Sequence, residues 1–487
     1  MDKLLKLIEN KLLFLGIAFL LFFIPLYPKF PLFAVSGTYV SIRLEDLFVA
    51  LVVGLFGLWV VLKRDFSFLK WNLTRIILLY FGIGLLSIIS GILITKNIVP
   101  HIAFLHFLRR VEYISLLFIT YFSFKRMKQL PVFGWIILIA TFGVIFYGLG
   151  QKFFAWPVVS TMNKEFSKGM ILRLTWWARI NSTFAGHYDL AAFLVMILCL
   201  VISLVALIKK WYFKILVILL GMFSYYLLVL TASRVSFVAY LIGGLFILFF
   251  AKKKLWIVPF LILSILGMVF SADLGQRYAA TFHLDLSFLS GMVKVEPSQI
   301  AEVLPTATPT PTIAPVAPVV ASPVPIRGKP VPTSTPTPTP TMEATPSAEY
   351  FEPTELAVSR STDIRLKVEW PRAITAFLKN PILGTGYSSI TLATDNDYLR
   401  MLGETGLLGS LAFGAIILEI TRKIYLFLRR RDISRESRMI VLGISGAAIG
   451  YFLNATFIDV FEASKVVFFF WILMGVALKV IDIESAK

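Results

Sequence analysis

The chain has 487 residues, 58% of them hydrophobic, and a mean hydropathy of +0.82, which excludes a soluble fold because soluble domains are roughly 45–50% apolar. Its single cysteine, Cys199, excludes an intrachain disulfide and a cysteine-rich metal site. The net charge of +19 would suit nucleic acid, but many basic residues lie in short loops between apolar segments, which is typical of membrane topology.

Twelve apolar segments are predicted to be transmembrane helices. They have the length needed to cross ~30 Å of hydrocarbon at about 1.5 Å per residue. Each must be helical, because lipid offers no partner for unpaired backbone groups. A signal peptide would resemble the first segment, but a clear cleavage site is lacking, so we expect a retained helix. The segments are residues 13–27, 46–62, 76–94, 111–124, 131–150, 188–208, 212–230, 235–251, 255–271, 403–420, 439–457 and 464–480.

The loops between these segments predict the orientation of the chain. Alternate loops are strongly basic, and the positive-inside rule places basic loops in the cytoplasm. This predicts a multi-pass protein of the cell membrane with both termini cytoplasmic. Two loops assigned to the outside, residues 95–112 and 151–187, are also basic and do not fit the rule. The basic residues of the predicted inner loops are Lys63, Arg64, Lys70, Lys125, Arg126, Lys128, Lys209, Lys210, Lys252, Lys253, Lys254, Arg422, Lys423, Arg429, Arg430, Arg431, Arg435 and Arg438.

The predicted architecture is therefore an all-α integral membrane protein with three parts. Residues 1–271 hold helices one to nine, and residues 403–487 hold helices ten to twelve and a cytoplasmic tail. Between them, residues 272–402 form a large extracytoplasmic loop. Its Pro/Thr-rich tract, residues 305–347, cannot bury enough apolar surface to fold, so we expect a disordered spacer.

Polar residues gather near the predicted outer face, where charge is costly and points to function. Arg109 and Arg110 lie near the outer end of the fourth segment, where they could contact lipid headgroups or a diphosphate. Arg179 precedes the sixth segment and could also extend to headgroups. Arg234 follows a very short external turn, where topology does not explain a positive charge. The four histidines are scattered, and we expect neither a metal nor a cofactor.

A third polar group runs from Trp370 to Gly409. It contains turn signals at Asn380–Gly386 and carboxylates at Asp395, Asp397 and Glu404. A metal-free acid/base site needs such a carboxylate beside cations that hold a charged substrate. Asp397 and Glu404 could instead be first-turn carboxylates that stabilise the start of a helix.

Taken in order, these segments resemble the O-antigen ligase and polymerase superfamily of bacterial membrane glycosyltransferases. The family's Arg-x-x-(Gly/Ser)-Thr-Phe motif is similar to Arg179–Phe184, and its Ser-Arg pair is similar to Ser233-Arg234. Its Asn-Pro-x-x-Gly-x-Gly motif is similar to Asn380–Gly386. Its His/Asp-Asn-x-Tyr-Leu…Glu-x-Gly-x-x-Gly motif is similar to Asp395–Gly409.

The resemblance implies an enzyme that moves a polyprenyl-diphosphate-linked glycan to an acceptor hydroxyl of a glycan or lipid, at the outer membrane face. Arg179 and Arg234 would hold the diphosphate, since guanidinium pairs with phosphate in a bidentate way. Asp395 would activate the acceptor. Further substrate-binding residues would be Arg109, Arg110, Asn396, Tyr398 and Glu404.

Asp395 departs from the ligases, which have a histidine at this position. Aspartate at this position resembles the polymerases, which join repeat units, but an aspartate can serve as a base in either reaction. Ligase, polymerase and protein-glycosylating activities therefore stay open, as do the sugar and the linkage. Two other functions are alternatives: a polytopic transporter or lipid-linked glycan flippase, which should show mid-membrane carboxylates or broken helices, and a scaffold that displays residues 272–402.

Overall fold

The computed structural model describes residues 5, 7–36, 38, 41–64, 66–160, 171–174, 178–269, 274, 278, 363–391 and 393–487. The Pro/Thr-rich tract at residues 305–347 and most of the predicted loop at 272–402 lie outside these described residues. Predictions about the tract therefore stay predictions.

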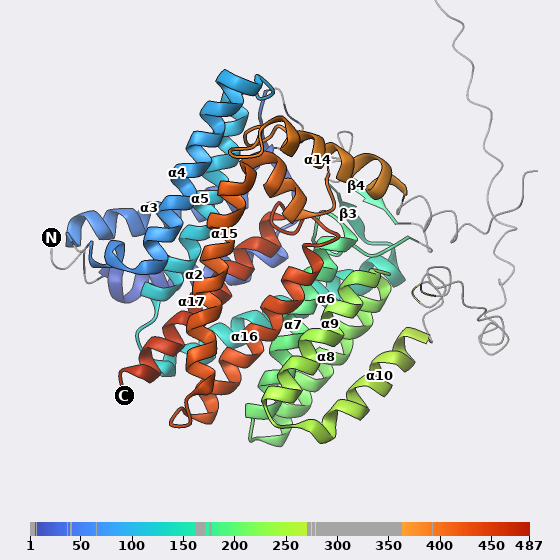
Figure 1. Cartoon of the computed structure of the whole chain (residues 1–487). Helices are drawn as coiled ribbons and strands as arrows, with labels where there is room; N and C mark the ends of the chain where they lie inside the picture. The colour runs from blue at the N-terminus through green and yellow to red at the C-terminus, as the bar shows by residue number, and fades with distance from the viewer. Residues whose placement is uncertain are drawn as a thin grey trace, which may run out of the picture.

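All twelve apolar segments are helices in the structure (Figure 1). Within the described residues, seven helices are long and apolar enough to cross a membrane, namely α3, α4, α6, α7, α8, α15 and α17, and the count of twelve crossings stays a prediction. The helices are α2 (Leu13–Leu26), α3 (Leu44–Lys63), α4 (Asn72–Ser90), α5 (Pro100–Ser123), α6 (Leu130–Phe154), α7 (His187–Leu207), α8 (Trp211–Leu230), α9 (Arg234–Phe250), α10 (Ile257–Val269), α15 (Asp397–Arg429), α16 (Arg435–Asn454) and α17 (Ser464–Ser485).

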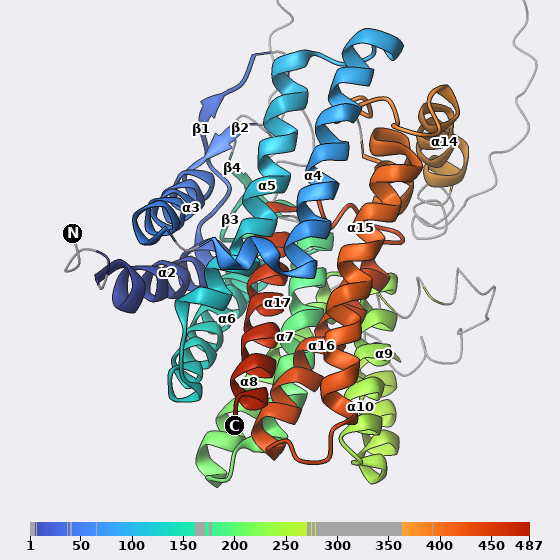
Figure 2. The same ribbon diagram turned by 60° about the vertical axis from the view of Figure 1, so that its left-hand side comes forward.

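Smaller elements join these helices. A two-stranded antiparallel sheet pairs β1 (Pro31–Ala34) with β2 (Ser41–Arg43), and a second pairs β3 (Pro157–Val159) with β4 (Ile171–Arg173). Helix α14 (Trp370–Lys379) continues from a π-helical turn at Arg365–Glu369. Figures 1 and 2 show α14 lying across the bundle near the start of α15, and α2 and α3 steeply inclined to the other helices.

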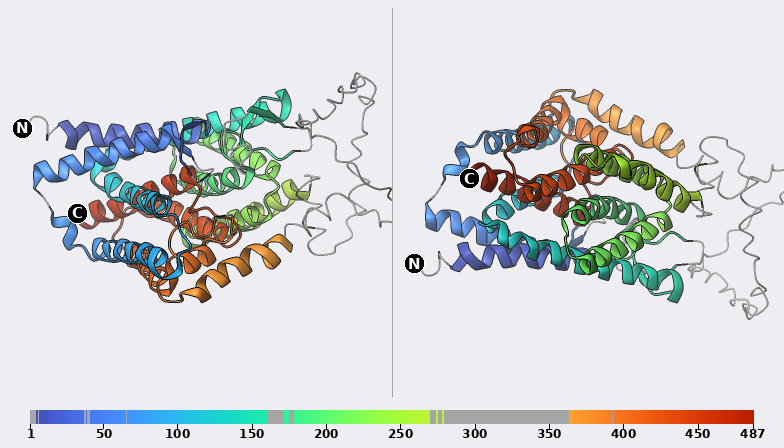
Figure 3. Two further views of the ribbon diagram at one scale, coloured as in Figure 1. Left: turned by 90° about the horizontal axis from the view of Figure 1, so that it is seen from above. Right: turned by 90° about the horizontal axis from the view of Figure 1, so that it is seen from below.

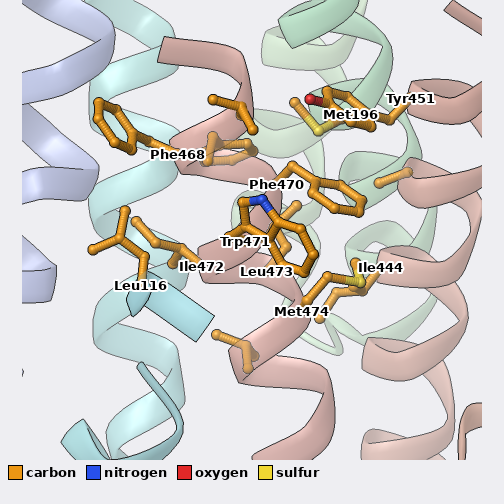
Figure 4. Close-up of a cluster of buried hydrophobic side chains, with 14 of the residues drawn as sticks. Leu116, Met196, Ile444, Tyr451, Phe468, Phe470, Trp471, Ile472, Leu473 and Met474 are labelled. Carbon is orange, nitrogen blue, oxygen red and sulfur yellow. The ribbon is translucent and has the colours of Figure 1, made fainter. Parts of the chain in front are cut away.

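Helix α17 lies at the centre of the packing. It packs against α5, α15 and α16, while α7 packs against α8, α9 and α16 (Figures 2 and 3). Figure 4 shows Trp471 of α17 among Phe470, Leu473, Met474 and Ile444, and Trp471 is only 1% exposed. Small residues permit the close helix contacts expected in membranes. A Cβ on Gly243 of α9 would lie 2.7 Å from the carbonyl oxygen of Gly446 in α16.

The polar segments gather at one end of the bundle. Ser236, in the first turn of α9, donates to Asn454 at the end of α16 at 2.6 Å, and Asp397 N–H, at the start of α15, donates to the Ala455 carbonyl at 2.9 Å. Helices α7, α8 and α9 are joined by short connections and alternate in direction. The basic connections at residues 208–210, 251–253 and 430–434 therefore lie at the opposite end.

Two helices are longer than the sequence predicted. Helix α5 begins at Pro100 rather than near residue 111, so the predicted outer loop at 95–112 is mostly helical. Helix α15 begins at Asp397 rather than at residue 403 and extends to Arg429. In both cases the missed turns carry charged and polar side chains, which lower hydropathy without preventing helix formation.

Candidate functional site

The segment Arg179–Phe184 is hydrogen-bonded to α6 and α2. Ser182 has a left-handed backbone (φ 50°), and its N–H donates to Gln151 Oε1 at 2.7 Å. Gln151 Nε2 donates back to the Ser182 carbonyl at 2.9 Å, which ties the segment to the end of α6. Thr183 Oγ1 donates to the Pro25 carbonyl of α2 at 2.5 Å. This anchoring places Arg179 just before α7.

Lys465 of α17 binds the same segment. It lies in the first turn of α17, is 1% exposed, and donates to the carbonyls of Thr183 (2.7 Å) and Tyr27. Its ammonium also lies 5.0 Å from the ring centroid of Phe184. A buried ammonium requires such partners. Lys465 is not among the site residues predicted from the sequence.

Arg234 is the first residue of α9. Ser233 caps this helix and accepts from Ser236 N–H at 3.4 Å, and Tyr278 donates to the Arg234 carbonyl at 2.7 Å. The Arg234 side chain is half-buried and interacts electrostatically with Arg179 and Arg365. Guanidinium groups from separate parts of the chain therefore repel one another. An anion bound near them would offset this repulsion.

Asp395 lies in the turn before α15 and has a left-handed backbone (φ 49°). The Asp459 carboxylate, from the loop between α16 and α17, accepts from the N–H groups on both sides of it, at Thr394 (2.8 Å) and Asn396 (3.2 Å). Asn396 caps α15 by accepting from Leu399 N–H at 3.0 Å. The amide oxygen of Asn396 is therefore engaged within the protein.

Arg365 completes the group, and the sequence did not single it out. Its Nε and Nη2 lie 2.9 and 2.7 Å from Oδ2 of Asp395. Its guanidinium is 5.9 Å from the ring centroid of Tyr188, at the start of α7. Tyr188 interacts electrostatically with Arg179, Arg365 and Asp395, so it links the separate motifs. Arg179 Nη1 lies 2.6 Å from Nε2 of the adjacent His187.

Two carboxyls beside Arg365 are shifted from their ordinary acidity. Burial raises the pKa of Asp395, and the Arg365 guanidinium opposes that rise. Burial, reinforced by the negative charge of Asp395, raises the pKa of Glu369 to about 7. Both groups lie outside the membrane-spanning helices. The raised values make both carboxyls stronger proton acceptors when ionised.

A second polar cluster adjoins the cluster of Arg179, Arg234, Arg365 and Asp395. Arg110 of α5 pairs with Glu462 and donates to the Phe461 carbonyl at 2.8 Å. Arg400 of α15 lies 3.3 Å from Asp459 and 3.7 Å from Glu404. Arg110, Asp397, Arg400, Glu404 and Glu462 line a small cavity of about 30 Å³, which is large enough to hold water. The cluster bonds the start of α15 to α5 and to the loop before α17.

The motif Asn380–Gly386 interlocks with α15. Helix α15 is kinked at Gly406 (φ 65°), and the N–H groups of Thr385 and Gly386 donate to the carbonyls of Gly403 (3.0 Å) and Glu404 (2.9 Å). A Cβ on Gly384 (φ 69°) would lie 2.5 Å from backbone atoms of Glu404. Glycine at these positions is a packing requirement, so this motif shapes the site without supplying reactive groups.

The structure thus places the predicted site residues in two different clusters, and some of them outside both. Arg179, Arg234 and Asp395 share one electrostatic cluster through Tyr188 and Arg365. Arg110 and Glu404 belong to the adjoining cluster, while Arg109 turns toward α3 and pairs with Asp46 at 3.1 Å. Tyr398 donates to the Phe452 carbonyl at 2.9 Å. The sequence predicts which charged residues belong to the site, but it does not predict which residues they pair with.

Comparison with known proteins supports the resemblance. Residues 216–414 match a family model described as O-antigen ligase. The match includes Ser233-Arg234, Asn380–Gly386 and Asp395–Gly409, and Arg179–Phe184 precedes it. No curated protein matches the chain. The match confirms similarity to the O-antigen ligase and polymerase superfamily, and the apolar helices identify a multi-pass membrane protein.

Proposed function

We propose that this membrane protein, whose residues 216–414 match the O-antigen ligase family, is a glycosyltransferase of cell-surface polysaccharide assembly. The family implies lipid-linked glycan and acceptor substrates in general. More specifically, we propose that it moves a polyprenyl-diphosphate-linked glycan to the hydroxyl of an acceptor glycan or lipid. Asp395, Arg179 and Arg234 would carry the reaction.

One observation carries this proposal: Tyr188 interacts electrostatically with arginines from three separate segments and with one carboxylate. Arg179 precedes α7, Arg234 begins α9, and Arg365 precedes α14. Like charges repel, so such a group favours a ligand with more than one negative charge. A diphosphate has this charge, and guanidinium groups bind phosphate oxygens in a bidentate way.

The proposed reaction assigns each residue a step. Arg179 and Arg234 hold the diphosphate and stabilise the charge that grows on it as the bond to the sugar breaks. The acceptor hydroxyl attacks the anomeric carbon, and Asp395 takes its proton. The lipid diphosphate leaves with the bonding electrons. Arg365 orients Asp395 through the bonds at 2.9 and 2.7 Å.

The proposed orientation follows from charge. The basic connections lie at the bundle end opposite Arg234, and basic loops are retained in the cytoplasm. On this proposal the site lies at the outer face of the cytoplasmic membrane, residues 272–402 are extracytoplasmic, and both termini are cytoplasmic. Asp395, rather than histidine, favours the polymerase type over the ligase type.

Substitution of Arg234 tests the proposal. We expect Arg234→Ala, expressed in cells that lack the native copy, to shorten or abolish the surface glycan, and Arg234→Lys to restore only part of it because an ammonium cannot bind phosphate in a bidentate way. Arg431→Ala is the matched control, since Arg431 is exposed at the opposite end. Full-length glycan from Arg234→Ala at normal protein level would contradict the proposal. Alternating access detected by labelling introduced cysteines would favour the transporter or flippase instead.

A further inference from the structure

A large apolar cavity lies far from the site. It has a volume of about 740 Å³ and is lined by residues of α2, α6, α7, α8, α16 and α17. Its deepest wall includes Ile472 and Leu473 of the central helix α17, which are 1% and 3% exposed. Helix α6 packs mainly on α2 and α8. The cavity therefore separates α6 from the centre of the bundle.

The interior of this cavity is lined mostly by apolar side chains. Among its lining residues Ser203 carries a hydroxyl, and that hydroxyl donates to the Met439 carbonyl. An apolar cavity of about 150 Å³ accepts a six-carbon ring, so 740 Å³ accommodates on the order of 30 carbon atoms. This capacity suits the two acyl chains of a phospholipid.

The rim of the cavity is charged. Lys209 follows α7, and Arg435 begins α16, where its Nη2 donates to the Ala206 carbonyl at 2.8 Å. Glu436 is also on the rim, and the exposed Lys210 adjoins it. The cationic side chains outnumber the carboxylate. A molecule that matches the cationic rim and the apolar interior has an anionic headgroup and long apolar chains.

We propose that this cavity binds an anionic phospholipid, with its headgroup between Lys209 and Arg435 and its acyl chains against α17. The rim lies at the end of α7 opposite Tyr188. Since α7 contains 21 residues, the two ends are about 30 Å apart. The bound lipid therefore comes from the leaflet opposite the glycosyl-transfer site and is distinct from the donor.

The lipid would also support the site at a distance. Its chains fill the space beside α6, and the far end of α6 holds the Arg179 segment through Gln151, which bonds Ser182 at 2.7 and 2.9 Å. Loss of the lipid is therefore expected to loosen α6 first. This inference does not depend on the proposed chemistry, because lipid binding is measured without any glycan substrate.

Native mass spectrometry and thermal unfolding of the full-length protein in detergent test the proposal, with phosphatidylglycerol and phosphatidylcholine of identical chains as probes. We expect one phosphatidylglycerol to be retained in preference and to raise Tm. Replacing Lys209 and Arg435 by Gln should weaken that preference by about fivefold for each charge removed. The exposed pair Lys252→Gln/Lys253→Gln, which does not line the cavity, should keep it.

A cavity-filling variant provides an independent test. Gly134 lines the cavity, and a Cβ there meets no atom within 4 Å, so Gly134→Phe should fold, occupy part of the cavity and weaken the retention of phosphatidylglycerol. Equal retention of the two phospholipids by the wild-type protein would overturn the proposal. So would unchanged retention by Gly134→Phe, or displacement of phosphatidylglycerol by an added polyprenyl phosphate, which would assign the cavity to the donor lipid.

Discussion

Asp459 holds Asp395 from both sides. One Asp459 oxygen accepts from Thr394 N–H at 2.8 Å and the other from Asn396 N–H at 3.2 Å, while Asp395 itself has a φ of 49°. A non-glycine residue in this region costs about 1–3 kcal/mol and persists only where its surroundings impose it. Asp459 therefore determines where the Asp395 carboxylate points.

We expect Asp459→Ala to reduce glycan transfer at least about tenfold, a loss of roughly 1.4 kcal/mol in transition-state stabilisation. The cause is loss of the turn at Asp395, and Asp459→Asn, which keeps one acceptor, should fall between. Transfer is measured as surface glycan relative to protein level. The exposed loop carboxylate Asp432 supplies the control, Asp432→Asn, which should be neutral. Normal glycan from Asp459→Ala would show that Asp395 holds its position without this support.

Arg365 should control the pH dependence of transfer. Burial raises the pKa of the Asp395 carboxyl, and Arg365 opposes that rise. In Arg365→Gln the pKa of Asp395 therefore rises further, and the acidic limb of the pH–rate profile should move to higher pH. The measurement is transfer rate against pH in isolated membranes supplied with lipid-linked donor.

A control for Arg365 lies on the same turn. Lys367 is 73% exposed and pairs with Asp363 at 3.0 Å, so Lys367→Gln removes one positive charge without touching Asp395. Its profile should match that of the wild-type protein. A profile for Arg365→Gln that is merely lower at every pH, without a shift, would contradict an effect through Asp395.

The interlock between Gly384 and Gly406 should be essential for folding. A Cβ on Gly384 would lie 2.5 Å from backbone atoms of Glu404, and one on Gly406 would lie 2.4 Å from the Ile382 carbonyl oxygen. We expect Gly384→Ala and Gly406→Ala to lower the free energy of unfolding by about 2–4 kcal/mol. Gly414, also in α15, has open space at its Cβ, so Gly414→Ala should be neutral or stabilising by up to about 1 kcal/mol. Thermal unfolding of the three variants distinguishes these outcomes.

Hydropathy predicted the helices well because a long apolar run in lipid has one structural solution. It failed where the helix is amphipathic: the first turns of α5 carry His101, His106 and Arg109, and the prediction began at residue 111. The ends of α15 were missed for the same reason. Hydropathy thus predicts the part of a helix that lies in lipid. Backbone hydrogen bonding extends the helix past that part.

Site prediction worked for residue type and failed for partners. Arg109 and Arg110 are adjacent in the sequence, yet a step along a helix turns the side chain by about 100°. One consequently pairs with Asp46 and the other with Glu462. Arg365 lies 30 residues before its partner Asp395 on a separate element, and nothing in its local sequence marks it. Asp459 and Glu462 were visible as two carboxylates in a short loop, without their targets.

Glu369 offers a pH test that needs no substrate. Its Oε2 is buried with no hydrogen-bond partner among the described residues, and burial raises the pKa of the carboxyl to about 7 from an ordinary value of 4.5. A raised pKa means that the folded protein binds the proton more tightly than the unfolded chain. The contribution of Glu369 to stability is therefore complete below pH 4.5 and is lost as the pH rises through about 7.

Glu369→Gln is neutral at every pH and should remove this dependence. We expect the variant and the wild-type protein to unfold at similar temperatures near pH 5, and the variant to be more stable at pH 8 by no more than about 2 °C, since Glu369 is partly exposed. Asp363→Asn, at an exposed carboxylate of the same helical segment, controls for the change in net charge. A difference between Glu369→Gln and the wild-type protein that is constant from pH 5 to pH 8 would mean that Glu369 does not titrate in this range, and would leave Asp395 as the carboxyl that governs the pH dependence of this site.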